Sequence, residues 1–110
     1  MKLEEGYELI VTIVNKGWSE KVIKVARQAG SQGATVLHAR GSGLHELTSF
    51  LGIAIEPEKE IILSVVQNDM SETIVAAISD ALNLKAHGTG ISMIIPLRGV
   101  TGLFKQSENP

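Results

Sequence analysis

The chain has 110 residues, enough for one domain with a real hydrophobic core. Its formal net charge of −2 argues against a nucleic-acid-binding surface, and the lack of cysteine excludes disulfides and thiolate chemistry. The longest apolar run falls far short of the roughly 20 residues that a membrane span needs. The N-terminus also lacks the apolar core of a signal peptide. We therefore expect one soluble, cytoplasmic domain over residues 1–110.

Four segments have the β-branched and apolar composition of strands. They are residues 7–14, 34–40, 61–67 and 91–95. With a helix expected after the first and third, the order is β-α-β, a long loop, then β-α-β. This order predicts an α+β domain with the ferredoxin-like βαββαβ fold, in which a four-stranded antiparallel sheet carries two helices on one face.

Two helices are predicted from their caps and apolar stripes. Ser19 is expected to cap the first helix, which ends near Gly30. Asp69 is expected to cap the second, with Glu72 completing a capping box and Asn83 at its end.

In the connection between the second and third strands, the apolar residues do not recur with the period of a helix or a strand. It is predicted to be one long loop over residues 42–58, and loops of this length in small domains are usually functional or disordered. The charged residues 56–60 are interpreted as a solvated approach to the third strand. Residues 105–110 form a polar tail.

The first and third strands are apolar on both faces, yet two helices can cover only one face of the sheet. Leaving three or four aliphatic side chains exposed would forgo several kcal/mol, at about 25 cal/mol per Å² of apolar surface. Contiguous apolar surface of this size is typical of an interface. The pattern therefore predicts that the open face packs against copies of itself in a closed cyclic oligomer.

Two glycine pairs are the candidate binding elements, Gly41-Ser42-Gly43 and Gly88-Thr89-Gly90. Backbone amides left uncovered by glycine can form a concavity that holds an anion such as phosphate. Arg98 could add a guanidinium fork to such a site. The alternative interpretation is that these glycines only make tight turns. Neither pair matches a phosphate loop or a dinucleotide fingerprint.

No catalytic cluster is evident from spacing, and we expect no enzymatic activity. The histidines are His38, His45 and His87, and no two of them have the spacing of metal ligands on a helix. His45-Glu46 is the best metal candidate, so a metal-binding trimer that uses loop histidines remains the alternative function. A small hydrolase that depends on Arg98 is a third hypothesis.

Several of these segments resemble the PII signal-transduction proteins. Ile13-Val14, the following turn and helix, residues 30–36 and Gly41-Ser42-Gly43 resemble the first half of that family. Gly88-Thr89-Gly90 and the strand that closes at Pro96 resemble its second conserved block. The resemblance runs in the right order from about Leu9 to Gly102.

The resemblance implies a ferredoxin-like homotrimer with inward-facing sheets that acts in nitrogen regulation. It implies that ATP, ADP or AMP binds between neighbouring subunits as a ligand, with no required cofactor. It also implies a mobile loop, the T-loop, here Ser42–Glu58, that docks on a partner protein such as an enzyme or a membrane transporter. The implied ligand-binding residues are, by position, Thr35, Gly41, Ser42 and Gly43 as one wall, Gly33 shaping it, Gly88, Thr89 and Gly90 as the phosphate-facing turn, and Ile13 near the base.

The chain also departs from the family pattern. The loop is several residues shorter and contains no tyrosine, and Ile91 occupies the place of a phosphate-binding lysine. Two arginines of the family fall on Gly102 and Phe104. Arg98 or Lys59 would have to replace these cations, so the resemblance implies an altered ligand site.

Overall fold

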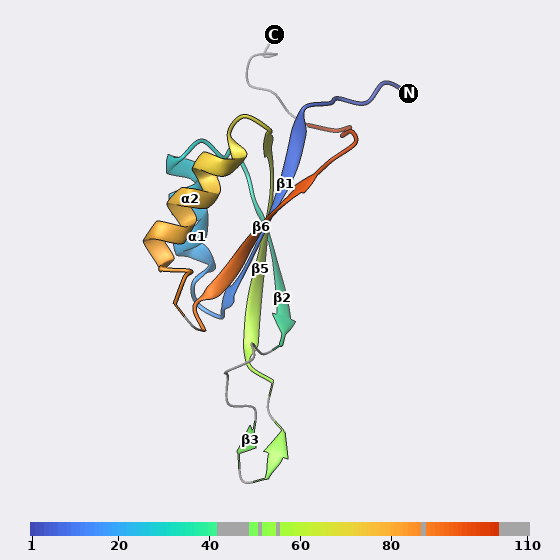
Figure 1. The fold of residues 1–110 in the computed structure, drawn as a ribbon. Helices are drawn as coiled ribbons and strands as arrows, with labels where there is room; N and C mark the ends of the chain where they lie inside the picture. The colour runs from blue at the N-terminus through green and yellow to red at the C-terminus, as the bar shows by residue number, and fades with distance from the viewer. Residues whose placement is uncertain (42–48, 51, 55, 87, 104–110) are drawn as a thin grey trace.

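The computed structural model describes residues 1–41, 49–50, 52–54, 56–86 and 88–103. The elements in chain order are β1 (Tyr7–Asn15), α1 (Ser19–Gln28), β2 (Thr35–Arg40), β3 (Ser49–Phe50), β4 (Ile53–Ala54), β5 (Glu58–Gln67), α2 (Ser71–Leu82) and β6 (Gly90–Pro96). Four strands form an antiparallel sheet in the order β2-β5-β1-β6, and both helices lie on one face of it (Figure 1). The predicted ferredoxin-like arrangement is confirmed.

The segment between β2 and β5 differs from the prediction of one long loop. β3 and β4 pair as a short antiparallel ladder, and Figure 1 shows them beyond the end of the main sheet. β5 also begins at Glu58, three residues before the predicted start at Ile61. Its charged first residues pair with Arg40 of β2 and Asn15 of β1, so backbone pairing on both sides overrides their low strand propensity.

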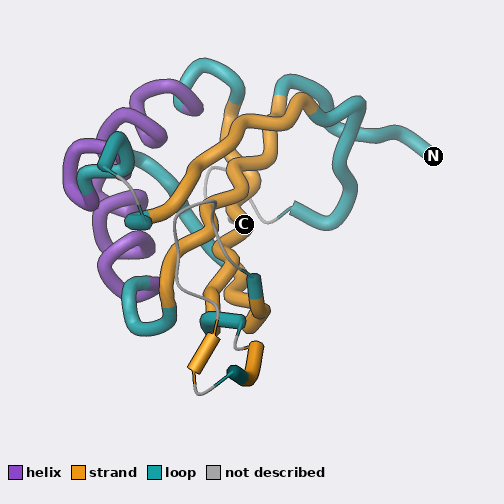
Figure 2. The backbone as a smooth tube through the Cα atoms, turned by 60° about the horizontal axis from the view of Figure 1, so that its bottom comes forward, coloured by secondary structure: helices purple, strands orange, loops and turns teal. Residues whose placement is uncertain are grey.

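The hydrophobic core lies between the sheet and the two helices, whose packing on one side is also seen in Figure 2. Alternate residues of β1 and β5 point into it, as the strand period of two requires. The buried core residues are Ile10, Val14, Val22, Ala26, Ile62, Val66, Ile74, Ile78 and Leu82. The predicted helix stripes are therefore confirmed. Within the described residues, no helix has the length and apolar character needed to span a membrane.

The face of the sheet away from the helices is apolar, as predicted. Register places its side chains in three rows across the strands: Val65–Leu9–Ile95, Thr35–Leu63–Val11–Met93 and Leu37–Ile61–Ile13–Ile91. All of them are exposed or only half-buried in the single chain, and Ile91 keeps 54% of its surface. We call these three rows the open face. They form one contiguous apolar surface.

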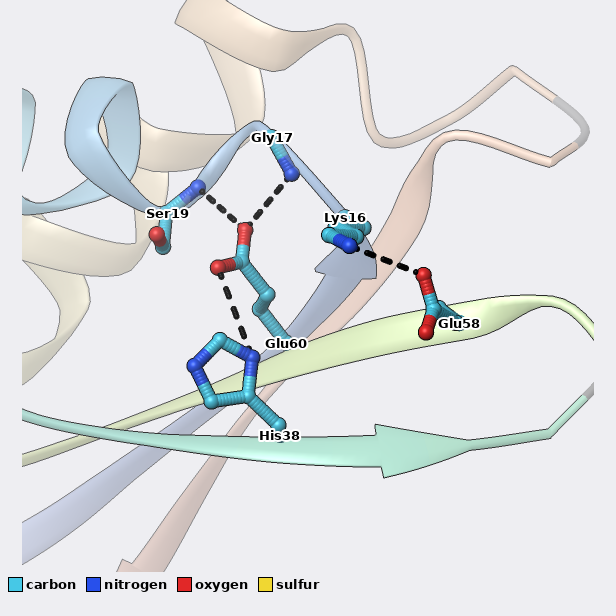
Figure 3. Close-up of polar contacts among 6 residues, drawn as sticks. All are labelled: Lys16, Gly17, Ser19, His38, Glu58 and Glu60. Atoms are coloured by element: carbon cyan, nitrogen blue, oxygen red, sulfur yellow. Dashed lines mark hydrogen bonds and ion pairs between the residues drawn. The ribbon is translucent and has the colours of Figure 1, made fainter.

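The start of α1 is held by a strand residue instead of the predicted Ser19 cap. The helix begins at Ser19 itself, and no side chain of the cap residue Trp18 bonds to it. The Glu60 carboxylate of β5 accepts hydrogen bonds from the Gly17 amide at 2.7 Å and the Ser19 amide at 3.3 Å (Figure 3). A carboxylate at a helix N-terminus satisfies unpaired amides and opposes the helix dipole.

The predicted Asp69–Glu72 capping box is also wrong. α2 begins at Ser71, and its cap residue Met70 makes no side-chain bond. The Ser71 hydroxyl donates instead to the Glu8 carboxylate of β1 at 2.6 Å. Both helices therefore begin at a contact with a glutamate from the sheet. The predicted end of α2 at Asn83 is confirmed, because this residue adopts the left-handed conformation at φ 52°.

Glu60 is buried although the charged run around it was interpreted as solvated. The hydrogen bond from the Gly17 amide holds the pKa of Glu60 below its ordinary value, against the burial that raises it. The second carboxylate oxygen faces His38 Nδ1 at 3.9 Å (Figure 3). Ionised Glu60 therefore stabilises the junction of β5, the β1–α1 turn and α1.

The first prediction concerns this carboxylate. Because the pKa of Glu60 is lower in the folded state, its contribution is present above the ordinary pKa and is lost as the pH falls through the folded value. Glu60→Gln should lower the free energy of unfolding at pH 7 by about 1–2 kcal/mol, because a neutral amide is a weaker acceptor. It should also flatten the loss of stability below about pH 5.

Denaturant unfolding at several pH values measures both effects. Glu58→Gln is the matched control, because Glu58 is exposed and pairs with Lys16 at the surface, 3.0 Å away. It should change stability less than Glu60→Gln does. Equal stability of wild type and Glu60→Gln at pH 7 would contradict the assigned role.

Candidate functional site

The predicted ligand residues lie in two separate places on the sheet. β1 and β2 finish, and β5 and β6 begin, at the same end, which we call the loop end. Gly41 and the turn Gly88–Gly90 lie at the loop end, with Ile13 close by in β1. Gly33 and Thr35 lie away from the loop end, where β2 begins and Thr35 pairs with Leu63 in the middle of β5. The fold of one chain therefore does not bring these two groups of residues together.

The Gly88–Gly90 turn is fixed from both sides. Asn15 at the end of β1 donates through Nδ2 to the Gly88 carbonyl at 2.9 Å. The Thr89 hydroxyl faces the carbonyls of Asn83 and Ala86 at 2.9 and 3.0 Å, which tie the turn to the end of α2. The Thr89 side chain therefore holds the turn, and the backbone amide is the group of this residue left to meet a ligand.

Gly90 must be glycine for two reasons. Its φ of +142° is rare for residues with a side chain, and an added Cβ would lie 2.5 Å from the Ile13 carbonyl oxygen. Gly88 also has a positive φ, at +78°, but open space surrounds its Cα. The close approach of β6 to β1 thus fixes where the turn ends.

Gly41 lies at the other edge of the sheet from this turn. Its amide donates to the Pro57 carbonyl at 3.1 Å, which joins the two ends of the 42–56 connection. β2 and β6 are three strand spacings apart, about 14 Å. Ser42 and Gly43 lie outside the described residues. Within one chain, Gly41 and the Gly88–Gly90 turn therefore do not form a common cradle.

Gly33 and Thr35 line an open hollow of about 780 Å³ at the far end of the sheet. Side chains of the open face and the β2 approach form most of its wall. The lining residues are Tyr7, Leu9, Gly30, Gln32, Gly33, Ala34, Thr35, Leu63, Val65, Val66, Gln67, Met70 and Leu103. None of them carries a charge, so the hollow suits an apolar or aromatic group better than a phosphate.

Arg98 is far from the glycine turn that it was expected to assist. It is exposed in the segment after β6, near the N-terminal end of β1, where the Leu97 amide donates to the Tyr7 carbonyl. β6 separates it from Gly90 by six residues of strand, about 20 Å. Arg98 therefore does not supply a cation to the Gly88–Gly90 turn of its own chain.

The loop end carries a polar contact between Lys59, which the sequence analysis named as a possible replacement cation, and Asn15, which it did not place in the site. Lys59 Nζ donates to Asn15 Oδ1 at 2.6 Å, on the same face as the three rows of the open face. Beside it, the Lys16 ammonium holds the pKa of Glu58 below its ordinary value. The cross-strand pairing of Asn15 with Lys59 was the missed signal, because it follows only if β5 starts before Ile61.

The described residues contain no cluster of three potential metal ligands. Of the three histidines, His38 is exposed on β2 and faces Glu60. His45, Glu46 and His87 lie outside the described residues, so the metal-binding alternative stays a hypothesis from the sequence.

Comparisons with known proteins agree with this fold. The family model "Nitrogen regulatory protein P-II" matches residues 7–103. The PII protein of Arabidopsis thaliana, solved with citrate, superposes with a TM-score of 0.65 at 20% identity, over 84% of this chain and 78% of the other.

A second similar structure is CPII of Thiomonas intermedia K12, a nitrogen regulatory PII-like protein bound to ADP, AMP and bicarbonate. Its TM-score is also 0.65, at 15% identity, over 84% of this chain and 90% of the other. No curated protein sequence matches the chain. Since the family model covers nearly the whole fold, from β1 to the segment after β6, the chain belongs to the P-II nitrogen regulatory protein family.

Proposed function

We propose that this protein is a cytoplasmic, homotrimeric P-II regulator without enzymatic activity. It binds a small anionic ligand between neighbouring protomers, with adenine nucleotides as the first candidates, and regulates a partner protein through the segment 42–58. The open face is the observation that carries this proposal. The family membership supports the regulatory class and the trimer.

The assembly follows from the three apolar rows of the open face. Covering exposed side chains such as Leu37, Ile91 and Ile95 would contribute on the order of 1 kcal/mol each, in every protomer. Rows this regular, on a face without a helix, favour packing against an identical face. A closed ring of copies buries all such faces with no surface left over.

The ligand site follows from the division of the candidate residues. The Gly88–Gly90 turn offers backbone amides at the loop end, and the hollow beside Thr35 offers uncharged walls at the far end. These two parts also lie toward opposite edges of the sheet. In a ring, opposite edges of neighbouring sheets approach each other. A ligand with both an aromatic ring and phosphates would then contact one part from each protomer.

The ligands of the two similar structures support the same chemical class. Citrate, bicarbonate, ADP and AMP are all small anions. Anions suit backbone amides at a glycine turn better than they suit the uncharged hollow. We therefore place Gly41, Gly88, Thr89, Gly90 and Ile13 on the side of the phosphates. We place Gly33 and Thr35 on the side of the adenine ring. Ser42 and Gly43 stay candidates from the sequence, and Arg98 could act only on a site formed with a neighbour.

A charge placed on the open face tests the assembly. Ile91→Asp should convert the trimer to protomers at micromolar concentration, because burying an unpaired carboxylate costs far more than the lost isoleucine contact. Sedimentation equilibrium measures the mass. Ala76→Asp, on the exposed side of α2, is the matched control and should remain trimeric. A folded wild-type protomer at the same concentration would refute the assembly and the shared site.

A charge placed in the hollow tests the ligand. Calorimetry with ATP, ADP, AMP and cyclic nucleotides should show binding of at least one of them to the wild type. Thr35→Asp should weaken that binding roughly tenfold, because the added carboxylate would have to be desolvated where the uncharged hollow receives the aromatic base.

Thr73→Asp makes the same change on the exposed face of α2 and should bind as the wild type does. Absence of heat with every nucleotide, for a protein shown to be trimeric, would remove the nucleotide from the proposal. Equal affinities of Thr35→Asp and Thr73→Asp would remove the hollow from the site.

A further inference from the structure

A chain of side-chain hydrogen bonds crosses the loop end from β5 to the Gly88–Gly90 turn. Lys59 Nζ donates to Asn15 Oδ1 at 2.6 Å, and Asn15 Nδ2 donates to the Gly88 carbonyl at 2.9 Å. Both ends of one amide are used, one as an acceptor and one as a donor. Asparagine is suited to this place because its short side chain offers both functions in one rigid plane.

The bond to Gly88 fixes the amide that follows it. The carbonyl of Gly88 and the N–H of Thr89 belong to one planar trans peptide and point in opposite directions. Asn15 therefore sets the direction of the Thr89 amide. In the described part of the chain, no group accepts a hydrogen bond from that amide. The Asn15 side chain thus orients a donor that is available to a ligand.

The same chain of contacts reaches the other edge of the sheet. Lys59 is two residues from Pro57, whose carbonyl accepts the Gly41 amide at 3.1 Å. Between them, the Glu58 carbonyl accepts the Lys16 amide at 3.2 Å, which holds the start of β5 against the end of β1. Gly41 and the Gly88–Gly90 turn, at strands about 14 Å apart, are thereby joined through β5 and Asn15.

We infer that Asn15 and Lys59 are positioning residues that couple ligand occupancy at the Gly88–Gly90 turn to the start of β5, where the 42–58 segment returns to the sheet. This inference rests on the proposed function, because it names how that ligand site communicates. A ligand that bonds to the Thr89 amide favours one orientation of the peptide. Through Asn15, it also favours one position of Lys59 and β5. By linkage, a partner that fixes the start of β5 tightens ligand binding by the same factor.

The first experiment needs no ligand. The 15N relaxation order parameter of the Thr89 amide is measured in wild type, Lys59→Met, Asn15→Ala and the double variant. Lys59→Met should lower this order parameter, although the lysine does not touch this residue. In the Asn15→Ala background, the same substitution should have no further effect, because the intermediate contact is already gone.

Lys16→Met is the matched control, since Lys16 is a lysine at the same end of the sheet whose ammonium pairs with Glu58 and not with Asn15. It should leave the Thr89 order parameter unchanged. Thermal unfolding of each variant separates local loosening from global loss of stability. A Thr89 order parameter that is equal in Lys59→Met and wild type, or additive effects in the double variant, would overturn the coupling.

The second experiment reads the segment itself. Since the chain has no cysteine, Ser49→Cys gives one site for an environment-sensitive fluorophore on β3. Saturating ADP or ATP should change its fluorescence in the wild-type background. Lys59→Met should lose this fluorescence response even at nucleotide concentrations that calorimetry shows to be saturating for this variant. Lys16→Met should keep both.

The two experiments separate the failure of the inference from that of the proposed function. A Lys59→Met protein that binds nucleotide and gives the full fluorescence response would overturn the coupling, with the ligand site intact. A wild type that binds no nucleotide would refute the proposed ligand, and the order-parameter cycle would then decide the coupling alone.

Discussion

The sheet has two faces, and the chain provides helices for only one of them. This imbalance determines most of the other features of the molecule. The helix side is closed by buried residues such as Ile10, Ile62 and Ile74, and is complete within one chain. The other side has three rows of mostly apolar side chains with no covering element among the described residues. A contiguous apolar surface of this kind is typical of an interface.

The order of strands and helices along the chain and the apolar open face could be predicted because both depend on local periodicity. Strands with apolar residues on both faces, such as 61–67, indicate two covered faces without knowledge of their partners. The helix starts could not be predicted in this way. Ser19 and Asp69 are good caps by residue type, yet the contacts come from Glu60 and Glu8, 41 and 63 positions away from the helix residues they hold. Local rules favour the nearest polar side chain, whereas the fold provides a stronger acceptor from the neighbouring strand.

The candidate site could also be predicted only in part: the glycine turns were found, and the side chains that orient them were not. Glycine turns are visible in a sequence because no other residue replaces glycine at φ values such as that of Gly90. The side chains that orient such turns are not visible, since Asn15 and Lys59 meet only through the register of two strands. The separation of the predicted residues over opposite edges of the sheet also cannot be read from their spacing in the sequence. Under the proposed assembly, residues of a neighbouring protomer would have to complete the site.

Gly90 belongs to both the candidate ligand site and the open face. Its backbone lies so close to β1 that a single carbon atom would meet the Ile13 carbonyl oxygen, and Ile91, the next residue, begins the exposed apolar positions of β6. Widening this contact would move β6 relative to β1, and a slip of one residue would turn Ile91, Met93 and Ile95 toward the helices. Gly90, which has no side chain, thus keeps β6 in the register that forms the open face, on which copies of the protein would recognise each other. Selection for subunit recognition would act on this position even in a descendant that has lost every ligand.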